Sequence, residues 1–147
     1  YVIATSRSDE ACLDSTRQAS QGLTMTDYFD VIFTGPISED EKYVLMQHAE
    51  VFIYPSLYEG FAYPCLEAMS VGTSVVTSTV SALPEVLGDA ALYANPWRPE
   101  SIAAIVEELL RDQNLRNNHI EKGREKVKKY QDSESVMLLW KELFGKI

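Results

Sequence analysis

Residues 51–78, VFIYPSLYEGFAYPCLEAMSVGTSVVTS, carry the strongest indication of the fold. This stretch opens with an apolar, β-branched run, passes through a loop that contains Gly60, and continues from Pro64 into helix-forming residues. A second β-branched run follows Gly72. Because proline suits the first turn of a helix and glycine the position just past its end, this stretch predicts a strand, a helix and another strand. Both runs are too continuous for half-exposed antiparallel strands, so they indicate buried parallel ones.

The same alternation of strand-like and helix-like segments extends to both sides of this stretch. Further strands are expected at Val2–Thr5, Val31–Phe33 and Leu92–Tyr93. Helices are expected at Asp9–Gln21, from Ser38 (the cap of a capping box with Glu41) to Ala49, at Pro84, and at Glu100–Asp112, Asn114–Tyr130 and Ser133–Phe144. Repeated strand–helix–strand units predict an α/β fold, a Rossmann-like parallel sheet flanked by helices with a helical C-terminal extension. Ligands bind at the carboxyl ends of such strands, which directs attention to residues 55–63 and 78–84.

Composition and charge exclude several classes of protein. The 147 residues suffice for one domain with a core, and no apolar run reaches the roughly 18 residues of a membrane span. A net charge of −9 argues against nucleic-acid partners, which require clustered cations. The basic segment 121–130 mixes both signs and is interpreted as a solvated helix face, with peripheral membrane association as the weaker alternative. Cys12 and Cys65 stand far apart, which favours a reducing compartment, and we expect a cytoplasmic location or one at the inner face of the membrane.

Two carboxylates accompany the helix that Pro64 opens. Glu59 lies in the preceding loop, and Glu67 lies in the first turn of the helix or just beyond it. A helix N-terminus binds phosphate through free backbone N–H groups, and Gly60 would permit a tight or left-handed turn beside it. Carboxylates suit sugar hydroxyls instead, so the pattern suggests a ligand with hydroxyls on both sides of a diphosphate, such as a nucleotide sugar. The plainer alternative is a solvated Glu59 and a Glu67 that only complements the helix dipole.

These residues resemble the signature of the retaining GT-B glycosyltransferases of family four, the glycosyl transferases group 1. The flanking segments within residues 31–112 are also similar to that family, including the Pro55-Ser56 pair and the Pro84-Glu85 loop. The signature comprises two glutamates separated by seven residues, with a Gly-Phe pair after the first and a Pro-x-Leu-Glu-Ala run around the second. The matching positions are Glu59, Gly60, Phe61, Pro64, Leu66, Glu67 and Ala68.

The resemblance implies a role for each position. Glu59 would be the catalytic residue that contacts the hydroxyls of the transferred sugar, and Glu67 would bind the ribose. Ile37 would lie along the base through its backbone. Such enzymes need no catalytic metal and no cofactor beyond the donor substrate. The backbone that meets the sugar and diphosphate would be that of Gly60, Phe61, Ala62 and Tyr63.

The chain also departs from the family pattern. Ala62 stands where glycine is usual, and its methyl group is tolerated only at a backbone angle allowed for other residues. Ser81, Ala82 and Leu83 replace a glycine-rich loop. The Arg and Lys that neutralise the diphosphate belong to a first strand and helix that the chain lacks, since YVIATS resembles the second strand. We therefore expect residues 1–147 to be a nucleotide-sugar-binding domain without its first strand–helix unit and without the N-terminal acceptor-binding domain.

The expected function is donor binding within a retaining hexosyltransferase that uses an NDP-sugar and a glycan, lipid or other acceptor. The chain alone is expected to be inactive. Two alternatives remain open, a non-catalytic nucleotide-sugar-binding module and a GT-B sugar-nucleotide epimerase. Outside the signature the plainer readings are preferred. Lys42 is interpreted as a solvated side chain, Cys65 as a small core residue, and Tyr54, Tyr58 and Tyr63 as packing residues.

Overall fold

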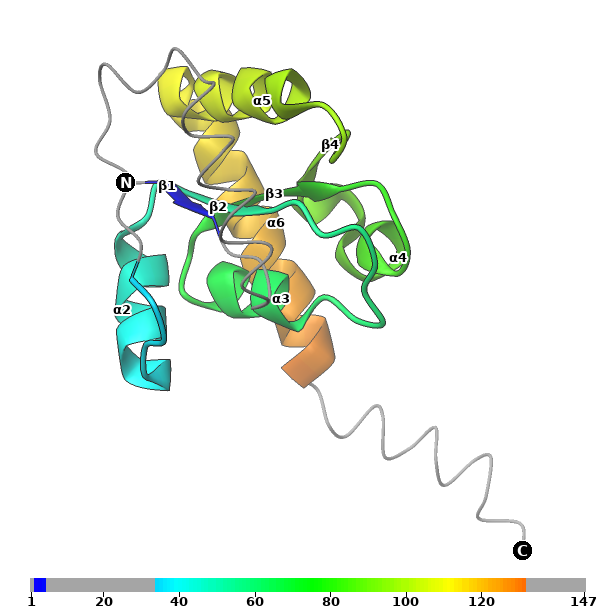
Figure 1. Ribbon diagram of the computed structural model, residues 1–147. Helices are drawn as coiled ribbons and strands as arrows, with labels where there is room; N and C mark the ends of the chain where they lie inside the picture. The colour runs from blue at the N-terminus through cyan, green and yellow to red at the C-terminus, as the bar shows by residue number, and fades with distance from the viewer. Residues whose placement is uncertain (1, 5–33, 132–147) are drawn as a thin grey trace, which may run out of the picture.

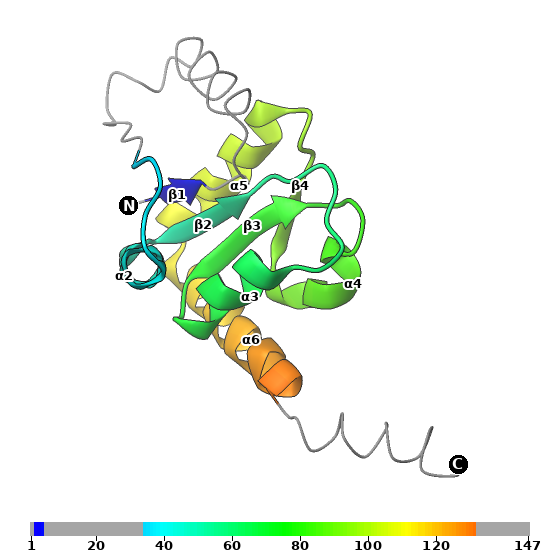
Figure 2. The same cartoon turned by 60° about the horizontal axis from the view of Figure 1, so that its bottom comes forward.

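A parallel sheet in the order β1-β2-β3-β4 forms the centre of the computed structural model, which describes residues 2–4 and 34–131. All three strand pairs are parallel. Figure 2 shows that β2 and β3 point the same way, so the loops that follow them lie at one end of the sheet. The strands are β1 (Val2–Ala4), β2 (Val51–Tyr54), β3 (Ser74–Ser78) and β4 (Leu92–Ala94).

The two central strands are buried because helices cover both of their faces. Every residue of β3 is buried, and so are Val51, Phe52 and Tyr54 of β2. The hydroxyl groups of β3 find acceptors in the backbone on or beside β2, as buried polar groups must. Ser74 donates to the carbonyl of Glu50 at 2.9 Å, Thr77 to that of Tyr54 at 2.7 Å, and Ser78 to that of Ser56.

The helices divide between the two faces of the sheet. α2 (Glu39–His48) and α3 (Tyr63–Ser70) lie on one side and α5 (Pro99–Arg111) on the other (Figure 1). After β3 come α4 (Leu83–Leu87) and a short 3₁₀ turn at Gly88–Ala90. The long α6 (Gln113–Gln131) packs against α3. The larger core cluster, centred on Phe52, Met69 and Leu87, therefore lies on the face that α3 covers.

Close packing fixes α6 against α3. Gly123 of α6 is buried, and a Cβ atom at this position would lie 2.9 Å from Cγ of Met69 in α3. Just past α3, Gly72 adopts a φ of +85°, and the Arg124 guanidinium lies over it. Met69 is 1% exposed, so it has little room to move away. α6 thus holds in place the helix that carries Glu67.

The predicted elements are confirmed wherever the structure describes them. The fold is the expected Rossmann-like parallel sheet flanked by helices, and Ser38 caps α2 through the expected capping box with Glu41. Three predictions, the helix at Asp9–Gln21, the strand at Val31–Phe33 and the helix at Ser133–Phe144, lie outside the described residues. Among the helices described, none combines the length and apolar character that crossing a membrane requires.

Candidate functional site

The carboxylate of Glu59 is held at the carboxyl end of β2 by two hydroxyl groups. Tyr54, the last residue of β2, donates from its phenolic oxygen to Oε1 of Glu59. Ser56 donates to the same oxygen at 3.0 Å. Tyr54 is only 2% exposed, so its hydroxyl group is fixed by the core on which its ring packs. In the described residues, both donors to this carboxylate reach Oε1, and Oε2 receives none.

The backbone of Glu59 is held from the loop after β3. Ser81 donates from its hydroxyl group to the Glu59 carbonyl oxygen at 2.6 Å, and the Ala82 N–H donates to the same oxygen at 3.4 Å. Ser81 adopts a φ of +55°, the left-handed region that favours glycine. Among the described residues it is the one non-glycine residue there. Ser81, which stands where the family pattern has a glycine-rich loop, therefore contacts the loop of Glu59 through its side chain.

The N-terminus of α3 has no side-chain cap. Ala62 occupies the cap position and has no oxygen with which to accept the first N–H groups of the helix, and Pro64 follows in the first turn. By contrast, Ser38 and Glu41 satisfy the N-terminus of α2 in both directions. Since unsatisfied N–H groups carry the positive end of the helix dipole, α3 offers an anion site at the carboxyl edge of the sheet.

Two residues of the loop before α3, Ala62 and Gly60, meet the sequence expectations differently. Ala62 has a φ of −102° and is fully buried, so its methyl group is accommodated without strain and fills part of the core. Gly60 is not among the glycines with a positive φ, so it does not adopt the left-handed conformation that the sequence permitted. A Cβ atom at Gly60 would meet nothing within 4 Å, so this side of the loop is open.

Glu67 forms an ion pair with Lys42 that bridges α3 and α2. The Lys42 Nζ lies 3.0 Å from Oε2 of Glu67 and 2.5 Å from Oε2 of Glu39. The hydrogen bond to Glu39 raises the pKa of Lys42, burial opposes the shift, and Glu67 adds to it. The interpretation of Lys42 as a freely solvated side chain is therefore wrong, since its ammonium group is only partly exposed and is shared between two carboxylates. The pair places the start of α2 beside α3.

Three further residues predicted to meet the donor are Phe61, Tyr63 and Ile37. Phe61 packs its ring edge-on against Tyr130 of α6, with ring centroids 5.6 Å apart, and also contacts Tyr63. Tyr63 is 68% exposed at the start of α3, yet its ring packs against Phe61 with centroids 4.7 Å apart, so the packing predicted for it is found on that side of the ring. Ile37 is exposed directly before the cap of α2. Glu59 precedes α3 and Glu67 lies within it, but the two carboxylates have different partners, and their shared use of one ligand stays a prediction.

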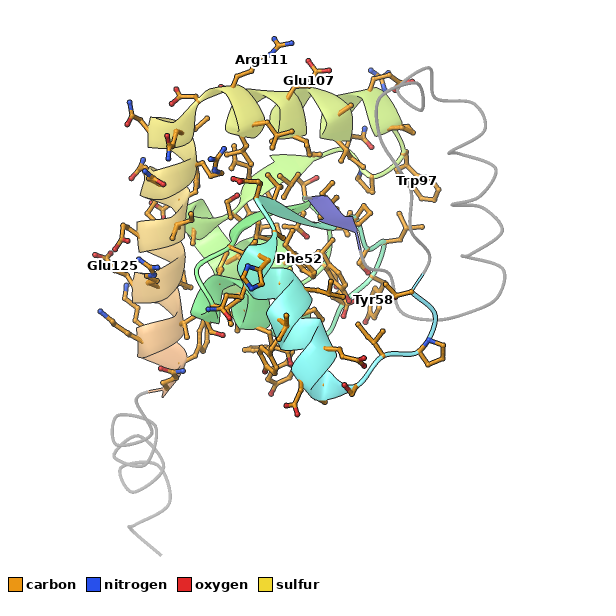
Figure 3. The ribbon with its side chains drawn as sticks, turned by 90° about the vertical axis from the view of Figure 1, so that its left-hand side faces the viewer. Phe52, Tyr58, Trp97, Glu107, Arg111 and Glu125 are labelled. Atoms are coloured by element: carbon orange, nitrogen blue, oxygen red, sulfur yellow. The ribbon has the colours of Figure 1, made fainter. Side chains whose placement is uncertain are left out.

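Two exposed aromatic residues mark the edge of the sheet at which Glu59 lies. Tyr58 precedes Glu59 and is 81% exposed, so the prediction that it packs is wrong, whereas Tyr54 is buried as predicted. Trp97 follows β4 and is also exposed. Figure 3 shows both on one side of the molecule, away from Glu125 on α6. This edge therefore carries aromatic surface next to the polar residues of the signature.

A shallow depression without room for a water molecule lies at the other face of the sheet, toward α5. Ile53, Val76 and Ile102 contribute to its lining, and no carboxylate does. It is mainly apolar and offers little to a charged ligand, so the loops around α3 are the better candidate. Within the described ranges, no three His, Cys, Asp or Glu side chains are grouped as a metal site would require.

Cys65 behaves as the core residue that the sequence predicted. Its side chain is fully buried in α3, and burial raises the pKa of its thiol to about 12, an effect that the nearby Glu59 charge reinforces. Nucleophilic chemistry at sulfur requires the thiolate. The position of Cys65 within the signature therefore reflects packing rather than catalysis.

We expect Cys65 to resist alkylation in the native protein. At pH 8 the folded thiol stays protonated and covered, whereas in urea it becomes exposed and regains an ordinary pKa near 8.5. Mass spectrometry after iodoacetamide treatment should find its peptide unmodified without urea and modified with it. Because only the unfolded chain loses this proton between about pH 9 and 12, the free energy of unfolding should fall over that interval, and it should fall less in Cys65→Ala, which has no thiol. Rapid native labelling at pH 8 would refute the assignment.

Comparison with known proteins adds a family relationship to this geometry. The family model described as "Glycosyl transferases group 1" matches residues 29–126. Over 98 residues the chain is 40% identical to O-antigen chain mannosyltransferase B of Escherichia coli, a match that covers 67% of this chain and 26% of that relative. It is 40% identical over 85 residues to the MMP alpha-(1->4)-mannosyltransferase of Mycolicibacterium hassiacum, covering 55% of this chain and 21% of the relative. The chain thus spans about a quarter of these relatives.

A solved structure shares the fold over nearly the whole chain. The sucrose-phosphate synthase from Thermosynechococcus elongatus superposes with a TM-score of 0.76 at 24% sequence identity. The match covers 99% of this chain and 37% of that one. At this identity the likeness supports the Rossmann-like architecture alone.

Proposed function

Because the chain belongs to the glycosyl transferases group 1 family, we propose that it is the donor-binding half of a retaining GT-B glycosyltransferase. The reaction moves a hexosyl group from a nucleoside-diphosphate sugar to a glycan, lipid or other acceptor. The observation that carries the proposal is the uncapped N-terminus of α3 with Glu59 before it and Glu67 within it. The family match over residues 29–126 includes both carboxylates.

The chemistry around α3 matches the parts of such a donor. The unsatisfied N–H groups and the helix dipole favour the diphosphate, and the open side of Gly60 lets a ligand approach the backbone. Glu59 has Oε2 available to accept hydrogen bonds from the transferred sugar. Glu67 accepts from the ribose hydroxyls, and the exposed turn at Ile37 lies along the base.

Mannose is the sugar that the relatives favour. The relatives compared above are named as mannosyltransferases, one of them in making an O-antigen chain. We therefore propose a nucleoside-diphosphate mannose as donor and a mannose-containing glycan or lipid as acceptor. No step requires a metal ion, so transfer should persist in excess EDTA.

The chain acts together with an acceptor-binding domain that precedes it in the intact enzyme. The match to about a quarter of each relative supports this division. The Arg and Lys that would neutralise the diphosphate lie in that preceding part, so the 147-residue chain alone should bind donor weakly and not turn it over. The intact enzyme is proposed to work in the cytoplasm, peripherally associated with the inner face of the membrane, where a lipid-linked acceptor would reside.

The direct test is a transfer assay with the intact enzyme and GDP-, UDP- and ADP-mannose, with mannobiose as acceptor. We expect one donor to support transfer, with the product keeping the donor's anomeric configuration by NMR. Epimerised donor without an acceptor would instead identify an epimerase. Binding of the nucleotide without any reaction would favour the non-catalytic module, and no binding of any donor would overturn the proposal.

Glu67→Gln is expected to weaken binding of the nucleoside diphosphate about tenfold, because a neutral amide forms weaker hydrogen bonds with ribose than a carboxylate does. Isothermal titration of the intact enzyme measures the effect, with Glu125→Gln, an exposed carboxylate on α6, as the matched control. The 2′,3′-dideoxy nucleotide should bind wild type and Glu67→Gln alike, since it lacks the hydroxyls. An equal loss of affinity for both nucleotides would show that Glu67 does not contact the ribose.

A further inference from the structure

The hydrogen bonds around Glu59 are arranged asymmetrically. Tyr54 and Ser56 both donate to Oε1, and no donor within residues 34–131 reaches Oε2. Tyr54 is buried, so its hydroxyl group approaches from the protein interior, and Ser56 also contacts the carbonyl of Tyr58. One oxygen of the carboxylate is therefore saturated by the protein, while the other keeps its acceptor capacity.

The backbone of the same residue is tied to a strained position in the neighbouring loop. The Ser81 hydroxyl donates to the Glu59 carbonyl at 2.6 Å while Ser81 itself holds a φ of +55°. Glycine would adopt this conformation without strain, but it would provide no hydroxyl group. Strained residues persist where the surrounding structure holds them and cluster at functional sites. The β3–α4 loop thus contains a strained residue, and the side chain of that residue donates a hydrogen bond to Glu59.

We propose that Tyr54, Ser56 and Ser81 form a clamp that positions Glu59 for the transferred sugar. Tyr54 and Ser56 fix the carboxylate through Oε1, so Oε2 is the oxygen that accepts from a sugar hydroxyl. Ser81 fixes the position of the Glu59 backbone through the hydrogen bond to its carbonyl oxygen. The three act through Glu59 and are positioning residues. This inference rests on the proposed function, in which Glu59 contacts the donor sugar.

Tyr54→Phe removes one hydroxyl group and keeps the ring that fills the core. Tyr58→Phe is the matched control, because it removes an exposed hydroxyl group in the same loop. In the intact enzyme with its active mannose donor, Tyr54→Phe should lower kcat about tenfold and change KM less than twofold, since one hydrogen bond to a charged group is lost. Removing from the donor the sugar hydroxyl that Glu59 binds should lower kcat by a smaller factor in Tyr54→Phe than in wild type. Identical kcat and identical deoxy-sugar discrimination in the two variants would overturn the clamp.

Two substitutions at Ser81 separate positioning from stability. Ser81→Gly removes both the hydroxyl group and the strain, whereas Ser81→Ala removes the hydroxyl group and keeps the strain. Ser81→Gly should therefore melt at or above the wild-type temperature and Ser81→Ala below it, yet both should lower kcat by about threefold or more. A wild-type kcat in Ser81→Gly would show that Ser81 serves folding alone and would refute its place in the clamp.

Glu59→Gln distinguishes failure of the clamp from failure of the proposed function. If Glu59→Gln loses activity while Tyr54→Phe and both Ser81 variants keep full kcat, only the clamp is wrong. If Glu59→Gln itself turns over at the wild-type rate, the proposed role of Glu59 is wrong and the clamp fails with it. The expected outcome is a graded series, with Glu59→Gln most impaired and the clamp variants intermediate.

Discussion

Replacing Glu59 with Gln is expected to lower kcat of the intact enzyme at least 100-fold while leaving the fold unchanged. The amide oxygen can still accept from Tyr54 and Ser56, which orients the NH₂ group to the place where Oε2 now stands. In the proposed complex, the acceptor that faces the sugar thereby becomes a donor, and the negative charge is lost. Hydrogen bonds to charged groups contribute about 1.5–3 kcal/mol each, so the loss of one or two accounts for an effect of this size.

The control for this substitution is Glu125→Gln. Glu125 is exposed on α6, on the side of the molecule away from Tyr58 and Trp97 (Figure 3). Glu125→Gln removes the same charge at a position far from the loops around α3, so the kcat of this variant should match that of wild type. Urea unfolding of both variants should give midpoints close to that of wild type. A kcat for Glu59→Gln within threefold of the Glu125→Gln value would remove Glu59 from the reaction.

Gly123→Val is expected to destabilise the folded chain by about 2–3 kcal/mol, because added atoms in a close-packed interface force shifts. A Cβ atom there would lie 2.9 Å from Cγ and 3.2 Å from Cβ of Met69, atoms near the backbone that cannot swing aside. The clash should also push α3 away from α6 and so disturb the helix that carries Glu67. Urea unfolding followed by circular dichroism measures the loss, and Glu125→Val, exposed on the same helix, is the control.

Shortening the opposing side chain should restore part of this stability. Met69→Ala alone leaves a cavity and costs about 2–5 kcal/mol, but the valine at position 123 would fill part of it. The loss of unfolding free energy in the double variant should therefore be smaller than the sum of the two single losses, by about 1 kcal/mol or more. Strict additivity, or a Gly123→Val variant as stable as Glu125→Val, would contradict the packing described for α3 and α6.

The described elements could be predicted from the sequence because each carries a local signal. Continuous β-branched runs marked β2 and β3, Ser38 and Glu41 marked the start of α2, and Pro64 and Gly72 bounded α3 within one or two residues. These signals depend on neighbours in the chain. They also placed the loops of residues 55–63 and 78–84 at one edge of the sheet, where the residues around Glu59 are found.

The contacts between those loops could not be predicted in the same way. The bond from Ser81 to Glu59 joins residues 22 positions apart and depends on a backbone angle that the sequence disfavours. Lys42 and Glu67 meet because α2 and α3 pack side by side, and no spacing rule relates two helices. Gly60 was expected to allow a tight or left-handed turn, and its φ is not in the left-handed region, while the space beside it is open. Side-chain partners across loops depend on tertiary geometry, which local patterns do not encode.

Binding of a nucleotide sugar around the N-terminus of α3 can be observed residue by residue through amide chemical-shift mapping. Uniformly ¹⁵N-labelled chain is titrated with GDP-, UDP- and ADP-mannose up to millimolar concentration, which detects the weak binding expected of this half. We expect the largest shifts at Gly60–Tyr63, with smaller ones at Lys42 and Glu67. Shifts confined to α5 and the outer face of α6, or no shifts with any of the three nucleotide sugars, would show that the donor does not bind at α3.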